Sequence, residues 1–237
     1  MPHPDPPDAI DEAASSLTVL ADPTRRSLYR FVTQQQDWVS REQAAEGLEI
    51  PAHTAKFHLD RLVDEGLLDV DFRRLTGRTG PGAGRPAKLY RRSDREISLS
   101  LPQRRYDLLS EILAQAAEVA VAGGDPMDEV ASRVSQREGH TLGAAAAGQA
   151  PSVESLRRLA LSLHPHGFEP RIDGDRMVLE NCPFDRVARD HTALVCGLNL
   201  DFVRGMASGL GCTDLQVSLE PSPGRCCVSA RRVPASG

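Results

Sequence analysis

The chain has 237 residues, a net charge of -5 and 40% apolar residues, which is enough length and apolar content for two modest domains with their own cores. It contains no apolar run of membrane-spanning length. Its first residues, MPHPDPPDAIDEAASS, are rich in Pro and Asp where a signal peptide needs a basic start and an apolar stretch. We therefore expect a cytoplasmic protein without a membrane segment, and a disordered N-terminus over residues 1–14.

Three amphipathic helices are predicted near the start of the chain. The first begins at Asp22 and Pro23, an N-cap followed by a favoured first helical residue. The second begins at Ser40, which forms a capping box with Gln43. The third lies in AHTAKFHLDRLVDEGLL, where apolar residues form one stripe and Thr54, Lys56, His58 and Arg61 occupy exposed or flanking positions. Two helices joined by a short turn predict a helix-turn-helix, whose second helix can lie in the DNA major groove.

A basic segment follows these helices although the net charge of the chain is negative. Residues 73–95 contain eight basic residues and one acidic residue, Asp94. The stretch LLDVDFRRLTGRTGPGAGRPAKLYRRS predicts a strand, a loop rich in Gly and Arg, and a returning strand, which together form a wing. A local cationic surface of this kind can neutralise DNA phosphates.

The stretches LADPTRRSLYRFV, AHTAKFHLDRLVDEGLL and GRPAKLYRRS resemble the ArsR-like winged-helix transcription regulators over residues 15–98. The resemblance implies a homodimeric regulator, in most cases a repressor, that binds a double-stranded DNA operator. The candidate DNA-binding residues are Ser40, Arg41, Thr54, Lys56, His58, Arg61, Arg78, Arg85 and Lys88.

The middle of the chain, LPQRRYDLLSEILAQAAEVAVAGG, carries apolar residues at near-heptad intervals. Such a stripe is either the core of its own domain or a seam to another copy of the chain. The resemblance to dimeric regulators favours the seam, so residues 99–150 are interpreted as a helical dimerisation segment and linker. The stretch GHTLGAAAAGQAPS, residues 139–152, is rich in small residues and is interpreted as a helix end followed by the linker.

Residues 151–237 predict a small α+β domain with helices against an antiparallel sheet, which makes the whole chain α+β. Two hairpin turns are expected, at Asp173-Gly174 and at Pro223-Gly224. All five cysteines fall in this domain, and none precedes residue 182. They are Cys182, Cys196, Cys212, Cys226 and Cys227.

The spacing of these cysteines is too wide for the CxxC knuckles of ordinary zinc fingers. Thiols from separate elements can converge through the fold, and soft sulfur ligands suit zinc or an iron-sulfur cluster rather than magnesium or calcium. The adjacent pair Cys226 and Cys227 is poorly spaced for a mutual disulfide. The sequence therefore predicts a metal centre.

The stretches NCPF, VCGLNLDFVRGMASGLG and PGRCCV, preceded by a winged helix, resemble the SufR-type iron-sulfur repressors. In that family four widely spaced cysteines hold a cluster, which implies a sensor of iron-sulfur or redox status. This chain departs from the family by a residue or two at the first two intervals and offers two cysteines for the last ligand. The family spacing favours Cys227, whereas alternation along a strand would place Cys226 and Cys227 on opposite faces.

Other interpretations of the cysteine domain stay open at this stage. Cys182-Pro183 is a dipeptide that also occurs at haem-responsive sites, and a thiol switch without metal is possible beside Arg225. Zinc is the alternative metal, with histidines as additional ligands. The histidines concerned are His164, His166 and His191. A cysteine nucleophile would make the protein an enzyme, but no Cys-His-Asp arrangement is recognisable, so we do not expect an enzyme.

Overall fold

The computed structural model describes residues 9–73, 86–148, 153–222 and 224–233. The chain divides into two compact units, residues 1–99 and residues 100–237. Both units combine helices with an antiparallel sheet, so the α+β class and the winged helix-turn-helix are confirmed.

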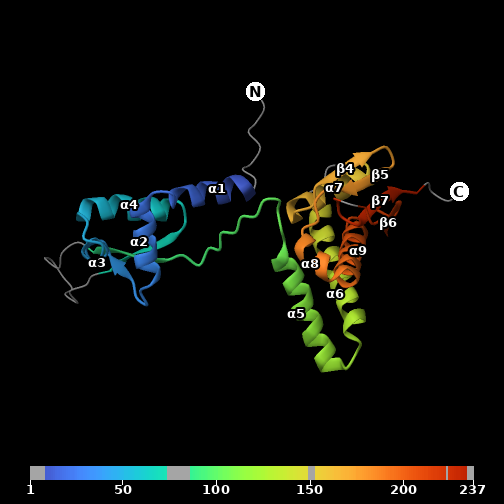
Figure 1. The fold of residues 1–237 in the computed structure, drawn as a ribbon, viewed down its shortest axis with the longest axis horizontal. Helices are drawn as coiled ribbons and strands as arrows, with labels where there is room; N and C mark the ends of the chain where they lie inside the picture. Colours follow the sequence, from blue (N-terminus) through green and yellow to red (C-terminus); the bar gives the residue numbers. More distant parts are fainter. Residues whose placement is uncertain (1–8, 74–85, 149–152, 223, 234–237) are drawn as a thin grey trace. The chain divides into compact units, whose positions relative to one another are not determined.

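The first unit contains four helices and three strands in the described residues (Figure 1). Along the chain these are α1 (Ala9–Val19), α2 (Pro23–Thr33), β1 (Val39–Ser40), α3 (Arg41–Gly47), α4 (Ala52–Asp64), β2 (Leu68–Arg73) and β3 (Ala87–Arg92). The strands form an antiparallel sheet in the order β1-β3-β2, in which β2 and β3 are the arms of the wing. The core beneath the sheet includes Leu28, Leu59 and Leu62, all fully buried.

Local capping signals determine where two of these helices begin. The Asp22 carboxylate accepts a hydrogen bond from the backbone N–H of Arg25, at 2.9 Å, and Pro23 is the first residue of α2. Ser40 and Gln43 form the predicted capping box, in which each side chain accepts from the other residue's backbone N–H. Both predicted helix starts are confirmed.

Of the residues 1–14 that we expected to be disordered, residues 9–14 belong to a helix, and residues 1–8 lie outside the described residues. Helix α1 begins at Ala9, and its last turn packs on the core through Val19. The Pro-rich composition behind that expectation ends at Pro7, after which Ala and acidic residues favour a helix.

The second unit contains a helical layer and a four-stranded sheet (Figure 1). Its helices are α5 (Tyr106–Gly123), α6 (Met127–Ala147), α7 (Ser155–Leu163), a 3-10 turn (His164–His166), α8 (Asp185–Asp190) and α9 (Thr192–Gly209). Its strands are β4 (Pro170–Asp173), β5 (Arg176–Leu179), β6 (Leu215–Leu219) and β7 (Val228–Arg232), in the antiparallel order β4-β5-β7-β6. Helices α7 and α9 pack against this sheet.

The apolar stripe of α5 lies in the core of its own unit rather than on a free surface. Leu109 and Ile112 are buried in one cluster with Val134 of α6 and Phe202 of α9. The interpretation of residues 99–150 as a separate dimerisation segment therefore differs from the structure, in which residues 100–237 fold as one unit. The physical reason is that α6 packs against α5 and covers the face that the sequence left without a partner.

Helices α6 and α9 lie side by side at backbone contact (Figure 1). A Cβ atom added at Gly139 would lie 2.0 Å from the carbonyl oxygen of Phe202, and one added at Gly205 would lie 2.0 Å from that of Gln136. Only glycine permits this approach. The small residues from Gly139 to Ala147 form the C-terminal part of α6, as the predicted helix end requires, and residues 149–152 of the predicted linker lie outside the described residues.

Candidate functional site

Helix α4 presents an outer face with charged side chains. Lys56 and Arg61 are about half exposed, and Thr54 is partly exposed. Each charged side chain forms an ion pair along the helix, Lys56 with Asp60 at 2.7 Å and Arg61 with Glu65 at 2.6 Å. The structure thus places three of the predicted DNA-binding residues on the accessible side of the second helix of the helix-turn-helix.

Two of the predicted DNA-binding residues are buried instead. His58 is only 9% exposed and accepts a hydrogen bond from Arg25 at its Nδ1 atom, 3.4 Å from Nε. A rotation of about 100° per residue places it at the edge of the buried stripe of α4, about 60° from Ala55 and about 40° from Leu62. Ser40 is also buried, because its hydroxyl caps α3. Its neighbour Arg41 is half exposed and is paired with Glu42 at 2.6 Å.

Asp60 connects the second helix to the wing. Its carboxylate accepts hydrogen bonds from Lys56 at 2.7 Å, from Lys88 of β3 at 2.6 Å and from the Tyr90 hydroxyl at 2.9 Å. Burial opposes the charged carboxylate, but these three hydrogen bonds outweigh it and lower the pKa of Asp60 to about 2. Asp60 therefore holds two predicted DNA-contacting lysines beside each other.

The base of the wing carries a second group of cations around an aromatic ring. The guanidinium groups of Arg73 and Arg91 lie 5.1 and 4.7 Å from the ring centre of Trp38. Each arginine is also paired with an acid of β2, Arg73 with Asp71 and Arg91 with Asp69. The predicted contacts Arg78 and Arg85 lie outside the described residues.

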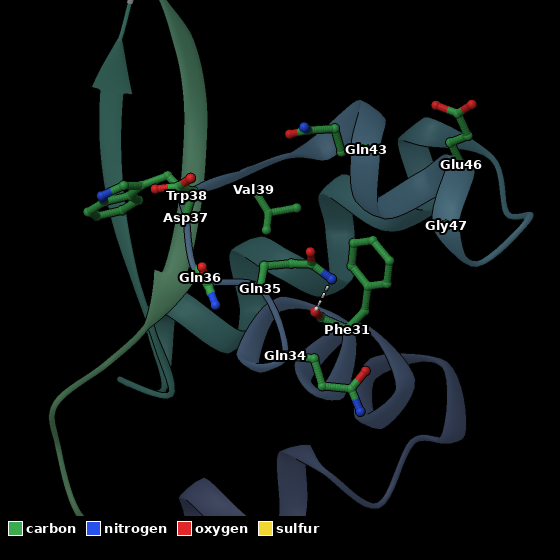
Figure 2. Close-up of a pocket in the computed structure, with 10 residues that line it drawn as sticks. All are labelled: Phe31, Gln34, Gln35, Gln36, Asp37, Trp38, Val39, Gln43, Glu46 and Gly47. Atoms are coloured by element: carbon green, nitrogen blue, oxygen red, sulfur yellow. Dashed lines mark hydrogen bonds between the residues drawn. The ribbon is translucent and has the colours of Figure 1, made fainter.

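An open hollow of about 630 Å³ lies beside α3, between the end of α2 and the turn that leads to β1 (Figure 2). Its lining includes the amides of Gln34, Gln35 and Gln36 and the carboxylates of Asp37 and Glu46, and none of the described residues that line it is Lys or Arg. Figure 2 shows these polar side chains spread around the hollow rather than converging on one point. Such a lining does not fit a phosphate, so the candidate nucleic-acid interface is the outer face of α4 with the wing.

Four of the five cysteines interact with one another in the second unit. Cys182 follows β5, Cys196 lies on α9, and Cys226 and Cys227 immediately precede β7. The side chain of Cys182 is hydrogen-bonded to that of Cys226, and the side chain of Cys196 to that of Cys227. Cys226 and Cys196 also interact electrostatically, which links the two pairs. We call these four residues the cysteine cluster.

Burial and mutual contact separate the pKa values of these thiols. The hydrogen bond to Cys226, followed by burial, raises the pKa of Cys182. Burial and the contact with Cys227 raise the pKa of Cys196 to about 12. The pKa of Cys226 is lowered, chiefly by the hydrogen bond from Cys182, with Asn199 contributing against the opposing effect of burial. The surroundings therefore favour the charged form of Cys226 and disfavour those of Cys182 and Cys196.

Asn199 is a buried polar residue that the sequence analysis did not identify. It is 2% exposed, and its Nδ2 atom donates to the sulfur of Cys226 at 3.1 Å. Its Oδ1 atom is buried without a hydrogen-bond partner among the described residues. Asn199 lies three residues after Cys196 on α9, so helical spacing was the signal that could have found it.

Cys212 does not belong to the cysteine cluster. It follows α9, is buried, and donates from its sulfur to the backbone carbonyl of Ser155 at 3.7 Å. Burial raises its pKa, and its charged neighbours are Arg158 and Asp214 rather than another cysteine. The structure thus separates Cys212 from the other four predicted metal ligands.

In the described part of the chain, no three His, Cys, Asp or Glu side chains are placed to hold a metal ion. His164, His166 and His191 therefore do not complete a site with the cysteines there. His166 instead contacts the edge of Phe202 and lies 3.4 Å from Arg105. The cysteine cluster consists of two linked thiol pairs and not of a ready tetrahedral ion site.

The segment that carries Cys182 is held by residues just before α5. Arg104 donates to the side-chain oxygen of Asn181 and, at 2.7 Å, to the carbonyl oxygen of Cys182. The amide of Asn181 donates in turn to the carbonyl oxygen of Gln103 at 2.9 Å. The backbone N–H of Arg105 donates to the carbonyl oxygen of Pro183. The chain entering the second unit and the Cys182 segment thus share one set of hydrogen bonds.

Comparison with known proteins identifies one domain. Residues 20–71, from just before α2 into β2, match the family described as a helix-turn-helix domain. No curated protein and no solved structure matches the chain. Among the described residues, no helix has both the length and the apolar character needed to cross a membrane. The match covers the two helices, α3 and α4, that form the candidate nucleic-acid interface.

Proposed function

We propose that this protein is a transcription regulator, acting as a repressor, that binds a double-stranded DNA operator as a homodimer and carries an iron-sulfur cluster in its second unit. The observation that supports DNA binding most strongly is the helix-turn-helix domain whose second helix has a free, cation-bearing face. A helix of this kind fits the major groove.

The cations divide into two roles in this proposal. Lys88 and the arginines at the base of the wing neutralise phosphates, which supplies affinity and fixes the position of the protein on the duplex. Lys56 and Arg61 face the groove from α4. Asp60 orients Lys56 and Lys88 before binding, so the phosphates replace an existing partner for two side chains that are already in place.

The cysteine cluster fits an iron-sulfur group by the chemistry of its donors. Four thiols from three separate parts of the fold meet in a largely buried place, and iron-sulfur clusters are held by such thiolates. The N–H of Asn199 points at one of the sulfurs, and hydrogen bonds to sulfur tune the reduction potential of a cluster. When bound, the cluster would supply sensitivity to oxygen or iron. Cys182, Cys196, Cys226 and Cys227 would hold it.

One further interpretation has an observation of its own. The thiols already meet as two pairs, which favours a thiol-redox regulator without metal as the alternative. Zinc is less well supported, because a zinc ion needs about four ligands around one point, each at about 2.0–2.3 Å. The described residues offer no such arrangement.

Homodimer formation must use other residues than the core of α5. Leu109 and Ile112 are buried within one chain. The exposed apolar side chains of the same helix lie near its C-terminal end, at Val119 and Val121, the latter 88% exposed. These are the residues of α5 that remain free to contact a second copy.

Anaerobic purification followed by iron, sulfide and zinc analysis tests the cluster. We expect brown protein that contains iron and acid-labile sulfide, and loss of both when Cys182, Cys196 or Cys226 is replaced with Ser. Cys212→Ser is the matched control, because that thiol is also buried but lies outside the cysteine cluster. Colourless protein without iron after anaerobic purification would reject the cluster, and a full, stable cluster in Cys182→Ser would reject the ligand assignment.

A further inference from the structure

Phe57 is a large apolar side chain on the outer face of α4. It is 65% exposed, whereas Ala55, Leu59 and Leu62 of the same helix are fully buried. A rotation of about 100° per residue places Phe57 roughly 200° from Ala55, directly opposite the core. One of its contacts is an edge-on approach to the His58 ring, at 5.2 Å between ring centres. The core of the first unit therefore does not account for Phe57.

The surroundings of Phe57 are charged rather than apolar. Lys56 precedes it, Arg61 lies one turn later on the same face, and both are about half exposed. These two cations are paired with Asp60 and Glu65 along the helix. An exposed ring between cations does not fit an apolar protein surface, which would have to bury those charges. The exposed ring and the cations beside it instead suit a polyanionic ligand that also carries an apolar group for the ring to contact.

We propose that Phe57 reads a thymine by packing against its C5-methyl group in the major groove. This inference rests on the proposed function and adds a base-reading residue to it. Thymine is the base whose major-groove edge carries a methyl group, and phenylalanine has no hydrogen-bond donor or acceptor with which to read any other feature of that edge. Lys56 and Arg61 bring the phosphates and neighbouring base edges to the two sides of the ring.

The test removes the methyl group alone. Duplexes that bind the full-length protein are selected from a random pool, and each thymine of the bound sequence is then replaced in turn by deoxyuridine. We expect the dissociation constant of the unaltered protein to rise about threefold to fivefold at one position in each half-site, because burying one methyl group changes binding by about that factor. With Phe57→Ala, replacement at that position should have no further effect.

A matched control is available in the same unit. Phe72 of β2 is 61% exposed, close to the value of Phe57, but it lies on the wing. Phe72→Ala should retain the full sensitivity to deoxyuridine. Phe57→Leu keeps an apolar contact and should retain part of that sensitivity, so it serves as the variant of choice where Phe57→Ala binds too weakly to measure.

The possible failures are distinguishable. The assignment of Phe57 is refuted, while DNA binding stands, by either of two results. One is that the protein binds selected duplexes but loss of the methyl group has no effect at any thymine. The other is that the sensitivity to this loss persists unchanged in Phe57→Ala. A Phe57→Ala protein that becomes monomeric by light scattering would make the ring a contact between copies instead. Failure to select any duplex would reject the proposed function and this inference with it.

Discussion

Replacing Gly205 with Ala should destabilise the second unit, whereas the same replacement at Gly197, on the same helix, should stabilise it. The new methyl group at Gly205 would lie 2.0 Å from the carbonyl oxygen of Gln136, where ordinary contact begins at 3.4 Å. The obstacle is backbone and cannot rotate away, so α6 and α9 must separate by more than one ångström. That separation also disturbs the close contacts at Gly139 and Gly143.

The magnitude follows from two opposing effects. Alanine in a helix interior is favoured over glycine by about 1 kcal/mol. Overpacking usually costs about 1–3 kcal/mol, and the rigid obstacle at Gly205 favours the upper part of that range. We therefore expect a net loss of about 2 kcal/mol in the unfolding free energy. Gly197 has no atom within 4 Å of the added Cβ, so Gly197→Ala should gain about 0.5–1 kcal/mol.

Urea unfolding of the full chain measures both variants. Trp38 is the single tryptophan of the protein and lies in the first unit, so its fluorescence follows that unit while circular dichroism follows both. Gly205→Ala should shift the unfolding of the second unit, which only circular dichroism follows, to lower urea concentration. The urea midpoint measured by Trp38 fluorescence, which follows the first unit, should not change. Equal stabilisation by both replacements would refute the close packing of α6 on α9.

Three further predictions concern the two candidate sites. Asp60→Asn should destabilise the first unit at neutral pH by on the order of 1 kcal/mol, as measured by unfolding followed through Trp38 fluorescence. The folded pKa of Asp60, about 2, lies below its ordinary value of 3.8, so the stability that the carboxylate contributes is lost as it becomes protonated. The difference between the variant and the unaltered protein should therefore disappear as the pH falls from about 4 to about 2. Asn199→Ala removes a donor to the Cys226 sulfur, so the pH at which Cys226 becomes half alkylated in cluster-free protein should rise, and an unchanged pH would contradict the role given to that amide. Arg104→Ala should speed hydrogen exchange at the backbone amides of Asn181 and Cys182 by about tenfold or more, because it removes two charged hydrogen bonds that each contribute roughly that factor. Arg171→Ala removes only an exposed pair with Glu180 and should leave this exchange unchanged.

Features that depend on a few neighbouring residues could be predicted from the sequence. The cap at Asp22, the capping box of Ser40 with Gln43 and the hairpin turn at Gly174 each involve contacts within four residues, and all three are present. The helix stop at Gly124 is equally local, because its positive φ of 71° suits glycine. Such signals determine where elements begin and end.

Features that depend on a partner far along the chain could not be predicted in the same way. Gly139 and Gly143 disfavour a helix locally, and only the distant glycines of α9 explain why α6 continues through them. The stripe of α5 was ambiguous for the same reason, because its periodicity was compatible both with another helix of the same chain, which proves to be α6, and with a second copy as the covering surface. His58 is different, since the helical period already places it near the buried stripe.

The start of strand β7 determines whether Cys226 and Cys227 can both join the cysteine cluster. Alternation along a strand would make Cys226 and Cys227 exclusive alternatives, but β7 begins only at Val228. The preceding turn lets Cys226 contact Cys182 and Cys227 contact Cys196. Both members of the pair therefore join the cysteine cluster, and of the alternatives that the sequence left open for the fourth thiol, the structure places the second member of the pair there and not Cys212.

The hydrogen bonds around Cys182 give the proposed sensor a physical connection to the DNA-binding unit. The first unit ends at residue 99, and within a few residues the chain bonds to the Cys182 segment through Gln103, Arg104 and Arg105. Asn181 cannot move without breaking its hydrogen bonds to Gln103 and Arg104. Breaking either bond leaves a polar atom of the buried Asn181 side chain without that partner, which costs free energy. A change at Cys182 that shifts this segment therefore acts on the chain where it leaves the winged helix.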